Sequence, residues 1–203
     1  MYTNFHVCAI LALNQMKFIS IDLELDQPTN HIIQIGAVQF CTVTNKTEYF
    51  HCYVDPGHPI GWEHTLNIGC SLENLLAPGF RQSWEVSKIP SKQALDSFWN
   101  WQKGRGKKFI QWGRGDMEIL KTESRVYPSH LRILDLKMTY QFLWQPSARL
   151  EKNAQLSIAC KAMNIAPPAP AHDAFADAFA TGQLFLKMFH QVEGVNNLLG
   201  KLS

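Results

Sequence analysis

Hydrophobic and polar positions divide the chain into strand-like and helix-like stretches. The first part contains three runs rich in β-branched and aromatic residues: KFISIDLEL at 17–25, HIIQIGAVQF at 31–40 and NKTEYFHCYVDP at 45–56. The turn-like DQPTN separates the first two. Runs of this kind, bounded by turn chemistry, are typical of strands. They predict an antiparallel meander of strands at the start of the fold.

From about residue 63 the pattern changes to mixed polar and apolar segments. In SKQALDSFWNWQ, at 91–102, the apolar residues Ala94, Leu95, Phe98 and Trp101 recur at helical spacing behind Ser91, which we expect to cap the helix. The later segments predict, in order, a buried strand at 107–113, a helix at 116–124, a short strand running into a helix at 132–144, a helix at 153–164 and a last, longest helix at 172–191. Helices inserted among strands predict an α/β or α+β sheet domain covered by helices.

Composition indicates one domain and says little about partners. The chain has 203 residues, 46% of them hydrophobic, which is enough to bury one sizeable core, and no Gly/Ser/Pro-rich linker divides it. The net charge of +2 gives no general attraction to polyanions, although a local basic patch is compatible with it.

Cysteine usage and hydropathy bear on the compartment. The five cysteines are an odd number without a Cys-x-x-Cys pair, which fits reduced thiols in a cytoplasmic protein better than a disulfide framework. They are Cys8, Cys41, Cys52, Cys70 and Cys160. The longest apolar run, VCAILAL at 7–13, is far shorter than the roughly 20 residues of a bilayer span, so we expect no membrane anchoring.

Acidic residues occur at four places where the surroundings are apolar. Asp22 and Glu24 end the first strand and point to the same side of it, Asp116 follows the strand FIQWG, and Asp177 lies in the last helix. Ionised carboxylates taken out of water are costly unless they are paired or bind a cation. Converging carboxylates suit hard cations such as Mg²⁺ or Mn²⁺, and two such ions about 3.5–4 Å apart serve phosphoryl hydrolysis.

Each of these residues also has a structural interpretation. An isolated acidic pair at a strand end can simply be solvated, and Asp116 fits an ordinary helix N-cap. Asp177 fits the polar stripe of an amphipathic helix, which Asp173 would share. The combination of all four positions favours the functional interpretation.

Taken in order, these motifs resemble those of the DEDDh 3′-to-5′ exonucleases. HIIQIGAVQF follows Asp22 and Glu24, Asp116 stands behind QWGRG, and His172 precedes Asp177 in AHDAFADA, so the similarity covers about residues 17–190. Within that superfamily, FIQWGRGDMEIL, ILDLKMTYQFL and LSIACKAMNI are most similar to the enhanced-RNAi and histone-mRNA 3′-end exonucleases and their bacterial sporulation-inhibitor relatives.

The resemblance implies a ribonuclease-H-like α/β fold, a five-stranded mixed sheet flanked by helices. It makes Asp22, Glu24, Asp116 and Asp177 the ligands of two Mg²⁺ or Mn²⁺ ions. His172 would be the general base that deprotonates the attacking water, a task that suits an imidazole near neutral pH. The expected activity is metal-dependent release of nucleoside 5′-monophosphates from the 3′ ends of single-stranded RNA or oligonucleotides.

Helical geometry places a condition on His172. Five residues along a helix turn through about 500°, which would leave His172 and Asp177 on different faces, so His172 has to precede the helix. The prolines of APPAPAH disfavour helix directly upstream. Asp173 is then a natural N-cap or first-turn acid.

Four residues are candidates for contacts with the substrate. Leu25 stands where the family often has Thr or another small residue, so its contacts with the terminal nucleotide are expected to differ. Leu66 and Ile68 lie in GWEHTLNIGCSLENLLAPGF, which corresponds to the loop and helix whose apolar residues wedge against terminal bases. Arg114 is a candidate for phosphate, as is KGRGKK at 103–108, which equally fits a solvated turn.

The chain divides into an N-terminal extension at 1–16, the exonuclease domain at 17–192 and a short tail at 193–203. Two other functions stay open: a DNA 3′-to-5′ exonuclease of repair or proofreading, and a catalytically silent nucleic-acid-binding module. The silent module is disfavoured because all five motif residues are present. A zinc site is not expected, because the histidines and cysteines between residues 51 and 70 match no common finger spacing. The oligomeric state is not indicated.

Overall fold

A six-stranded mixed β-sheet forms the centre of the computed structural model, which describes residues 16–44, 46–66, 69–125, 127–144 and 155–199. The strands are β1 (Lys17–Leu25), β2 (Ile32–Cys41), β3 (Glu48–Asp55), β4 (Ile89–Pro90), β5 (Lys108–Gln111) and β6 (Arg132–Asp135), in the spatial order β4-β3-β2-β1-β5-β6. Antiparallel pairing of β1 with β2 and of β2 with β3 confirms the predicted meander. β5 and β6 then add parallel to β1, which places β1 in the middle of the sheet.

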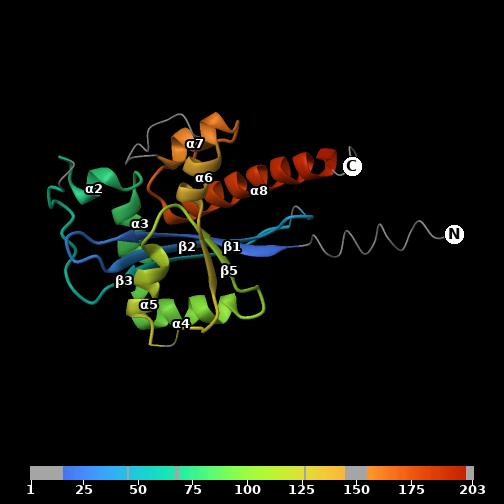
Figure 1. Cartoon of the computed structure of the whole chain (residues 1–203). Helices are drawn as coiled ribbons and strands as arrows, with labels where there is room; N and C mark the ends of the chain where they lie inside the picture. The colour runs from blue at the N-terminus through green and yellow to red at the C-terminus, as the bar shows by residue number, and fades with distance from the viewer. Residues whose placement is uncertain (1–15, 45, 67–68, 126, 145–154, 200–203) are drawn as a thin grey trace.

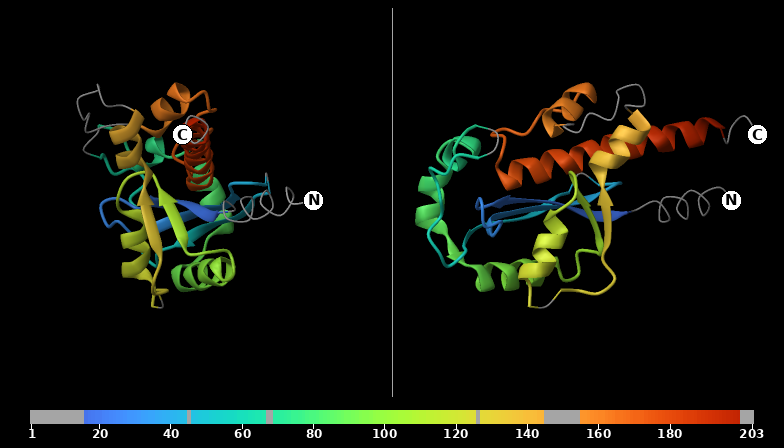
Figure 2. Two further views of the ribbon diagram at one scale, coloured as in Figure 1. Left: turned by 45° about the vertical axis from the view of Figure 1, so that its right-hand side comes forward. Right: turned by 60° about the vertical axis from the view of Figure 1, so that its left-hand side comes forward.

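Helices cover both faces of the sheet (Figure 1). They are α2 (Leu72–Leu75), α3 (Phe80–Ser87), α4 (Ser91–Gln102), α5 (Asp116–Glu123), α6 (Leu136–Trp144), α7 (Leu156–Ala162) and α8 (Ala174–Leu199). α4 and α5 pack on one face, and α6, α7 and α8 lie on the other (Figures 1 and 2). α2 and α3 lie at one end of the sheet, where the chain passes from β3 to β4. None of the described helices combines the length and apolar character that a membrane span requires.

The structure differs from the sequence-based expectations at three element boundaries. The sheet has a sixth strand, the two-residue β4, which ends at Pro90, a residue without an N–H for further pairing. Ser91 is the first residue of α4 and not its cap, because Pro90 occupies the N-cap position. α8 ends at Leu199, beyond the predicted helix end at residue 191, because one glycine, Gly194, costs a helix only about 1 kcal/mol relative to alanine.

The central strand β1 is buried on both faces, and its two faces differ in character. Ile19, Ile21 and Leu23 belong to the apolar cluster beneath α4 and α5. On the α8 side, Phe18 is packed into the second apolar cluster. Further along that side, at period two, come Ser20, Asp22 and Glu24. The polar end of β1 is therefore on the face that α8 covers.

Two glycines allow α8 to approach the sheet closely. A Cβ on Gly36 of β2 would lie 2.2 Å from the backbone carbon of Ala174, the first residue of α8. A Cβ on Gly182 of α8 would lie 2.0 Å from a ring carbon of Phe40 in β2. The helix thus crosses β2 with backbone against backbone at Gly36, and with its own backbone against the Phe40 ring at Gly182.

Replacement of Gly36 should disturb this contact. Gly36→Ala forces the first turn of α8 away from the sheet, and we expect a loss of about 3 kcal/mol in the free energy of unfolding, the size typical of overpacking in a well-packed core. Urea denaturation of both proteins measures this. Gly61→Ala is the matched control, since its Cβ would meet no described atom closer than 3.4 Å. Equal stability losses in the two variants would contradict the packing account.

Candidate active site

Asp22 and Glu24 lie on β1, on the face of the sheet that α8 covers. The antiparallel register pairs Asp22 with Gly36 and Glu24 with Gln34 of β2. Because Gly36 has no side chain, the start of α8 can lie beside Asp22. Glu24 retains only 9% of its surface exposed. Both carboxylates are therefore held by a central strand whose position is fixed on both edges.

Gln34 fixes the beginning of α8 against this pair. Its side chain is fully buried, its Oε1 accepts the Ala174 N–H at 2.9 Å, and its Nε2 donates to Asp173 Oδ2 at 2.9 Å. Asp173 Oδ1 accepts the Ala176 N–H at 3.0 Å, so Asp173 is the N-cap that the sequence predicted. Asp177 follows in the first turn of the helix and is carried to the side of the sheet where Glu24 lies.

His172 lies in the segment before α8, as helical geometry required. Its backbone adopts a left-handed conformation with φ of 56°, which is uncommon for a residue other than glycine and occurs most often where surrounding contacts enforce it. Its carbonyl accepts the Ala77 N–H at 3.2 Å, and its backbone lowers the pKa of the Asp177 carboxyl, partly offsetting the effect of burial. The turn at His172 thus ties the loop after α2 to the first turn of α8.

Asp116 reaches the same region from β5. This strand runs parallel to β1, with Ser20 opposite Ile110, so the segments after both strands begin at the same edge of the sheet. Gln111, at the end of β5, donates to the Gly113 carbonyl at 2.8 Å and accepts the Met117 N–H at 3.1 Å. These two bonds fold the Trp-Gly-Arg-Gly loop tightly and set Asp116 as the first residue of α5.

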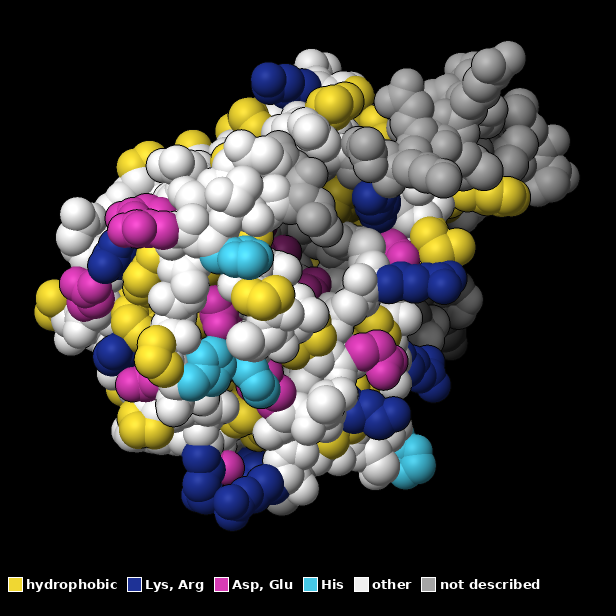
Figure 3. All heavy atoms as spheres, turned by 90° about the vertical axis from the view of Figure 1, so that its left-hand side faces the viewer, with side chains coloured by type: hydrophobic (Ala, Val, Ile, Leu, Met, Phe, Trp, Pro, Cys, Tyr) yellow, Lys and Arg dark blue, Asp and Glu magenta, His cyan; other side chains and the backbone are white. Residues whose placement is uncertain are grey.

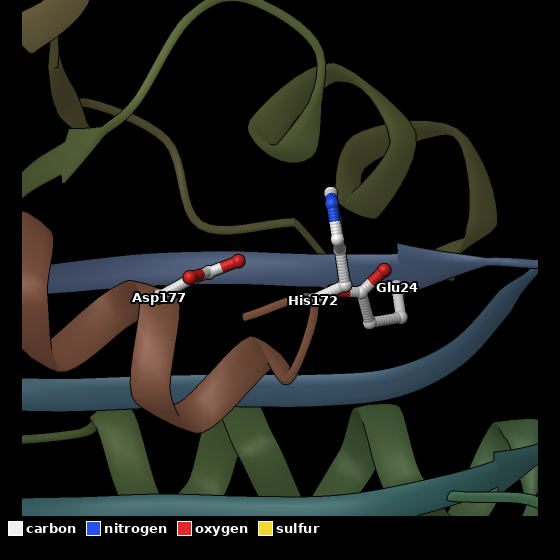
Figure 4. Close-up of side chains that lie close together, drawn as sticks. All are labelled: Glu24, His172 and Asp177. Atoms are coloured by element: carbon white, nitrogen blue, oxygen red, sulfur yellow. The ribbon is translucent and has the colours of Figure 1, made fainter. Parts of the chain in front are cut away.

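The side chains converge on a cleft of about 460 Å³. One ligand atom from each of Glu24, His172 and Asp177 lies within 4.8 Å of the others, and Figure 4 shows them extending from β1, from the segment before α8 and from α8 itself. The described lining comprises Asp22, Leu23, Glu24, Trp112, Lys137, Gln155, Leu156, Ser157, Pro168, Ala171, His172 and Asp177. In the space-filling view from the end of the sheet where α2 and α3 lie, acidic side chains occupy a hollow with a histidine at its rim (Figure 3).

Burial and mutual repulsion dominate the electrostatics of the site. Burial raises the pKa of Asp116 to about 7 and that of Asp177 to about 6. Burial, and then the charge of Asp116, raises the pKa of Asp22 well above its ordinary value. Burial and the charge of Asp177 do the same for the pKa of Glu24. Carboxylates held together without a cation resist ionisation, and a donor set of carboxylate oxygens fits hard divalent cations.

Three of the four residues expected to contact the substrate are described, and these three are not among the residues that line this cleft. Leu25 faces away from Glu24 and packs against the apolar cluster beneath α4 and α5. Leu66 is half-buried in a loop that its own backbone closes through hydrogen bonds with Gly69 and Cys70. Arg114 is exposed beside the cleft, with its Nε 3.7 Å from Asp135 Oδ2. Ile68 lies outside the described residues.

Two other sequence features lie away from the cleft. The KGRGKK loop precedes β5, at the opposite end of that strand from Asp116, and Arg105 within it pairs with Glu48 at 2.7 Å. It is the ordinary turn that its glycines allow, with positive φ at both Gly104 and Gly106. Within the described part of the chain, Glu24, His172 and Asp177 form the one group of three or more His, Cys, Asp or Glu residues whose ligand atoms lie within 4.8 Å of one another.

Three residues that build or line the site were not expected from the sequence. Gln34 and Gln111 hold α8 and the Asp116 loop, and Lys137 lines the cleft from the first turn of α6. A polar residue inside an otherwise apolar strand, as in HIIQIGAVQF and KKFIQWG, is the sequence signal for both glutamines, because buried amides require partners. The position of Lys137 depends on packing that no local pattern encodes.

Comparison with solved structures identifies the fold. Cell-death related nuclease 4 (CRN-4) matches with a TM-score of 0.62 and 16% identity, over 86% of this chain and 64% of that one. A full-length 3′-exonuclease matches with a TM-score of 0.60 and 17% identity, over 86% and 60%. Zinc-bound E. coli Exonuclease I in complex with single-stranded DNA matches with a TM-score of 0.60 and 16% identity, over 92% and 43%.

The chain has a ribonuclease-H-like fold. It spans less than two thirds of the length of each of these three chains. No protein-family model matches the sequence. No curated protein sequence matches it either. At 16–17% identity, the structural similarity establishes the shared architecture, and the chemistry has to be argued from the cleft.

The raised carboxyl pKa values predict how the metal-free protein responds to pH. In the unfolded chain these carboxyls ionise near pH 4, whereas in the folded protein Asp177 does so near 6 and Asp116 near 7. Between these values the folded state binds more protons than the unfolded state, so its stability falls as pH rises from about 4 to about 7. Thermal melting in EDTA across this range measures the fall.

A charge-neutral variant isolates this effect from other titrations. At pH 8 in EDTA, Asp116→Asn should stabilise the protein by about 1 kcal/mol or more, a rise in Tm of about 2–4 °C. The advantage should vanish below pH 4, where the wild-type carboxyl is protonated. Asp96→Asn on the exposed surface of α4 serves as control. A wild-type stability that rises between pH 4 and 7 and does not change in Asp116→Asn would contradict the account.

Proposed function

We propose that this protein is a metal-dependent 3′-to-5′ exonuclease that releases nucleoside 5′-monophosphates from single-stranded RNA or short oligonucleotides. The observation that carries the proposal is the meeting of Glu24, Asp177 and His172 in one open cleft, with Asp116 close enough to Asp22 for its charge to raise the pKa of Asp22. The similarity of the fold to several nucleases supports the same chemistry.

Four carboxylates, three of which line the cleft while Asp116 lies near Asp22, are suited to hold two divalent cations. Asp22, Glu24, Asp116 and Asp177 would be the ligands, since their oxygens repel one another without a positive charge between them. When bound, two Mg²⁺ or Mn²⁺ ions neutralise the charge that develops on the phosphate and lower the pKa of the attacking water. The protein's contribution is to hold these oxygens on a rigid strand and a rigid helix.

His172 is placed to accept the proton of the attacking water. Its exposed side chain stands at the edge of the cleft, next to Glu24 and Asp177. The water oxygen attacks phosphorus, the bond from phosphorus to the 3′-oxygen of the preceding nucleotide breaks, and that oxygen is protonated as the leaving group. The products are a nucleoside 5′-monophosphate and a strand with a new 3′-hydroxyl.

We place a chain end, and not an internal phosphate, in this cleft. Its acidic floor lies between β1, the start of α8 and the start of α7. A terminal nucleotide fits such a site, whereas an internal phosphate would bring a continuing strand on both sides. RNA is favoured over DNA on the similarity of QWGRGD to the RNA-processing branch; a DNA exonuclease of repair or proofreading is the alternative.

Two substitutions should separate metal binding from proton transfer. Asp177→Asn should abolish hydrolysis and remove most of the Tm increase produced by Mn²⁺, because one ligand charge is lost. His172→Ala should lower the rate by about 10²- to 10⁴-fold while retaining most of that Tm increase, as expected for loss of a general base. Melting curves and hydrolysis rates with Mn²⁺ or EDTA measure both. Full activity in Asp177→Asn would exclude the site.

The choice of strand end and sugar can be tested with labelled oligonucleotides. Single-stranded RNA with a 3′-hydroxyl should be shortened one nucleotide at a time, and a 3′-phosphate should block this. A blunt duplex should stall the enzyme, because unstacking each base costs a few kcal/mol. Circular RNA is the control for end dependence. Cleavage of the circle would refute the exonuclease assignment, and a strong preference for matched DNA would favour the repair or proofreading alternative.

A further inference from the structure

Lys137 is the one cation among the described residues that line the acidic cleft. It lies in the first turn of α6, is half-buried, and its Cδ stands 3.8 Å from the position a Cβ on Gly113 would occupy. The aliphatic stem of Lys137 therefore passes beside the loop that leads to Asp116, and its side chain lines the cleft that also contains Asp22, Glu24 and Asp177.

Within the described part of the chain, the ammonium group of Lys137 forms no ion pair and no hydrogen bond. A lysine beside several carboxylates would ordinarily pair with one of them. Arg114, on the neighbouring surface, is by contrast engaged by Asp135 and by the Met138 sulfur, 3.1 Å from its Nη2. Among the described residues, the charge of Lys137 thus has no partner.

The backbone beneath Lys137 is held firmly. Asp135 Oδ1 accepts the Met138 N–H at 3.0 Å, which caps the first turn of α6, and Leu136 is fully buried in the cluster beneath α8. β6, which leads into α6, is paired in parallel with β5 from Lys108 to Gln111. Lys137 therefore follows β6 after one residue, and Asp116 follows β5 after the Trp-Gly-Arg-Gly loop that Gln111 holds.

We propose that Lys137 binds a second backbone phosphate of the substrate, the one adjacent to the scissile phosphate on its 5′ side. This inference rests on the exonuclease function proposed above. The four carboxylates and two divalent cations would balance each other's charge, so the negative charge of the next phosphate has no partner among them. A strand that ends in a 3′-hydroxyl carries no phosphate beyond its terminal nucleoside, so any further phosphate lies on the 5′ side.

Substrate length distinguishes this role from a role at the reacting phosphate. A uridine dinucleotide contains only the scissile phosphate, whereas a uridine tetranucleotide also contains the next one. Lys137→Met, which keeps the length and apolar character of the side chain, should raise the ratio of tetranucleotide KM to dinucleotide KM about tenfold. It should also make the dependence of tetranucleotide binding on log salt shallower by about 0.7, the loss of one phosphate contact on a single strand.

The matched control is Lys92→Met on α4, a lysine on the other face of the sheet that pairs with Asp96 at 2.8 Å. It should leave both the KM ratio and the salt dependence at their wild-type values. Thermal melting of all three proteins confirms that they are folded. Equal changes in KM for both substrates in Lys137→Met, or no change for either, would overturn the inference while leaving the exonuclease function intact. Failure of the wild-type protein to hydrolyse either substrate with Mn²⁺ would overturn both.

Discussion

Helix α8 can approach the central sheet only because β2 presents Gly36 and Gln34 to its first turn. Gly36 leaves space for the Ala174 backbone, and Gln34 satisfies the Ala174 N–H and the Asp173 carboxylate from inside the sheet. The positions of Asp177 and His172 in the cleft depend on this contact. Asp177 is near Glu24 because the helix is close, and His172 is near both because the chain has to turn directly before the helix begins.

Gathering carboxylates in this way works against the stability of the metal-free protein. Side chains on one face of β1 belong to the apolar cluster beneath α4 and α5. On the other face, the strand ends with Asp22 and Glu24. Burial raises their pKa values, and so does the charge of the neighbouring acids. A bound cation would offset the repulsion among these carboxylates, because each negatively charged oxygen would then be attracted to the positive ion between them. The rigid packing of β1 and α8 holds the oxygens in place in both states.

The sequence predicted the features that depend on local pattern. Runs of β-branched residues indicated the meander, the prolines before His172 kept it out of the helix, and Asp173 was recognised as its cap. The fold class was predicted from the ordered motifs and is the one that the structure has. Period two along β1 already implied that Leu25 faces away from Glu24, yet the resemblance suggested a substrate contact there.

Features that depend on register or on packing between distant elements were not predictable. Gln34 and Gly36 matter because they pair with Glu24 and Asp22 across the sheet, and that register becomes visible only once the strands are aligned. Lys137 reaches the cleft because β6 pairs with β5. β4 forms because Ile89 and Pro90 pair with Val54 and Asp55 of β3.

The most direct test of the account is the location of divalent cations in crystals grown with Mn²⁺, by anomalous scattering at the manganese edge. We expect two peaks within about 2.2 Å of oxygens of Asp22, Glu24, Asp116 and Asp177. Peaks elsewhere, with none between these carboxylates, would contradict it.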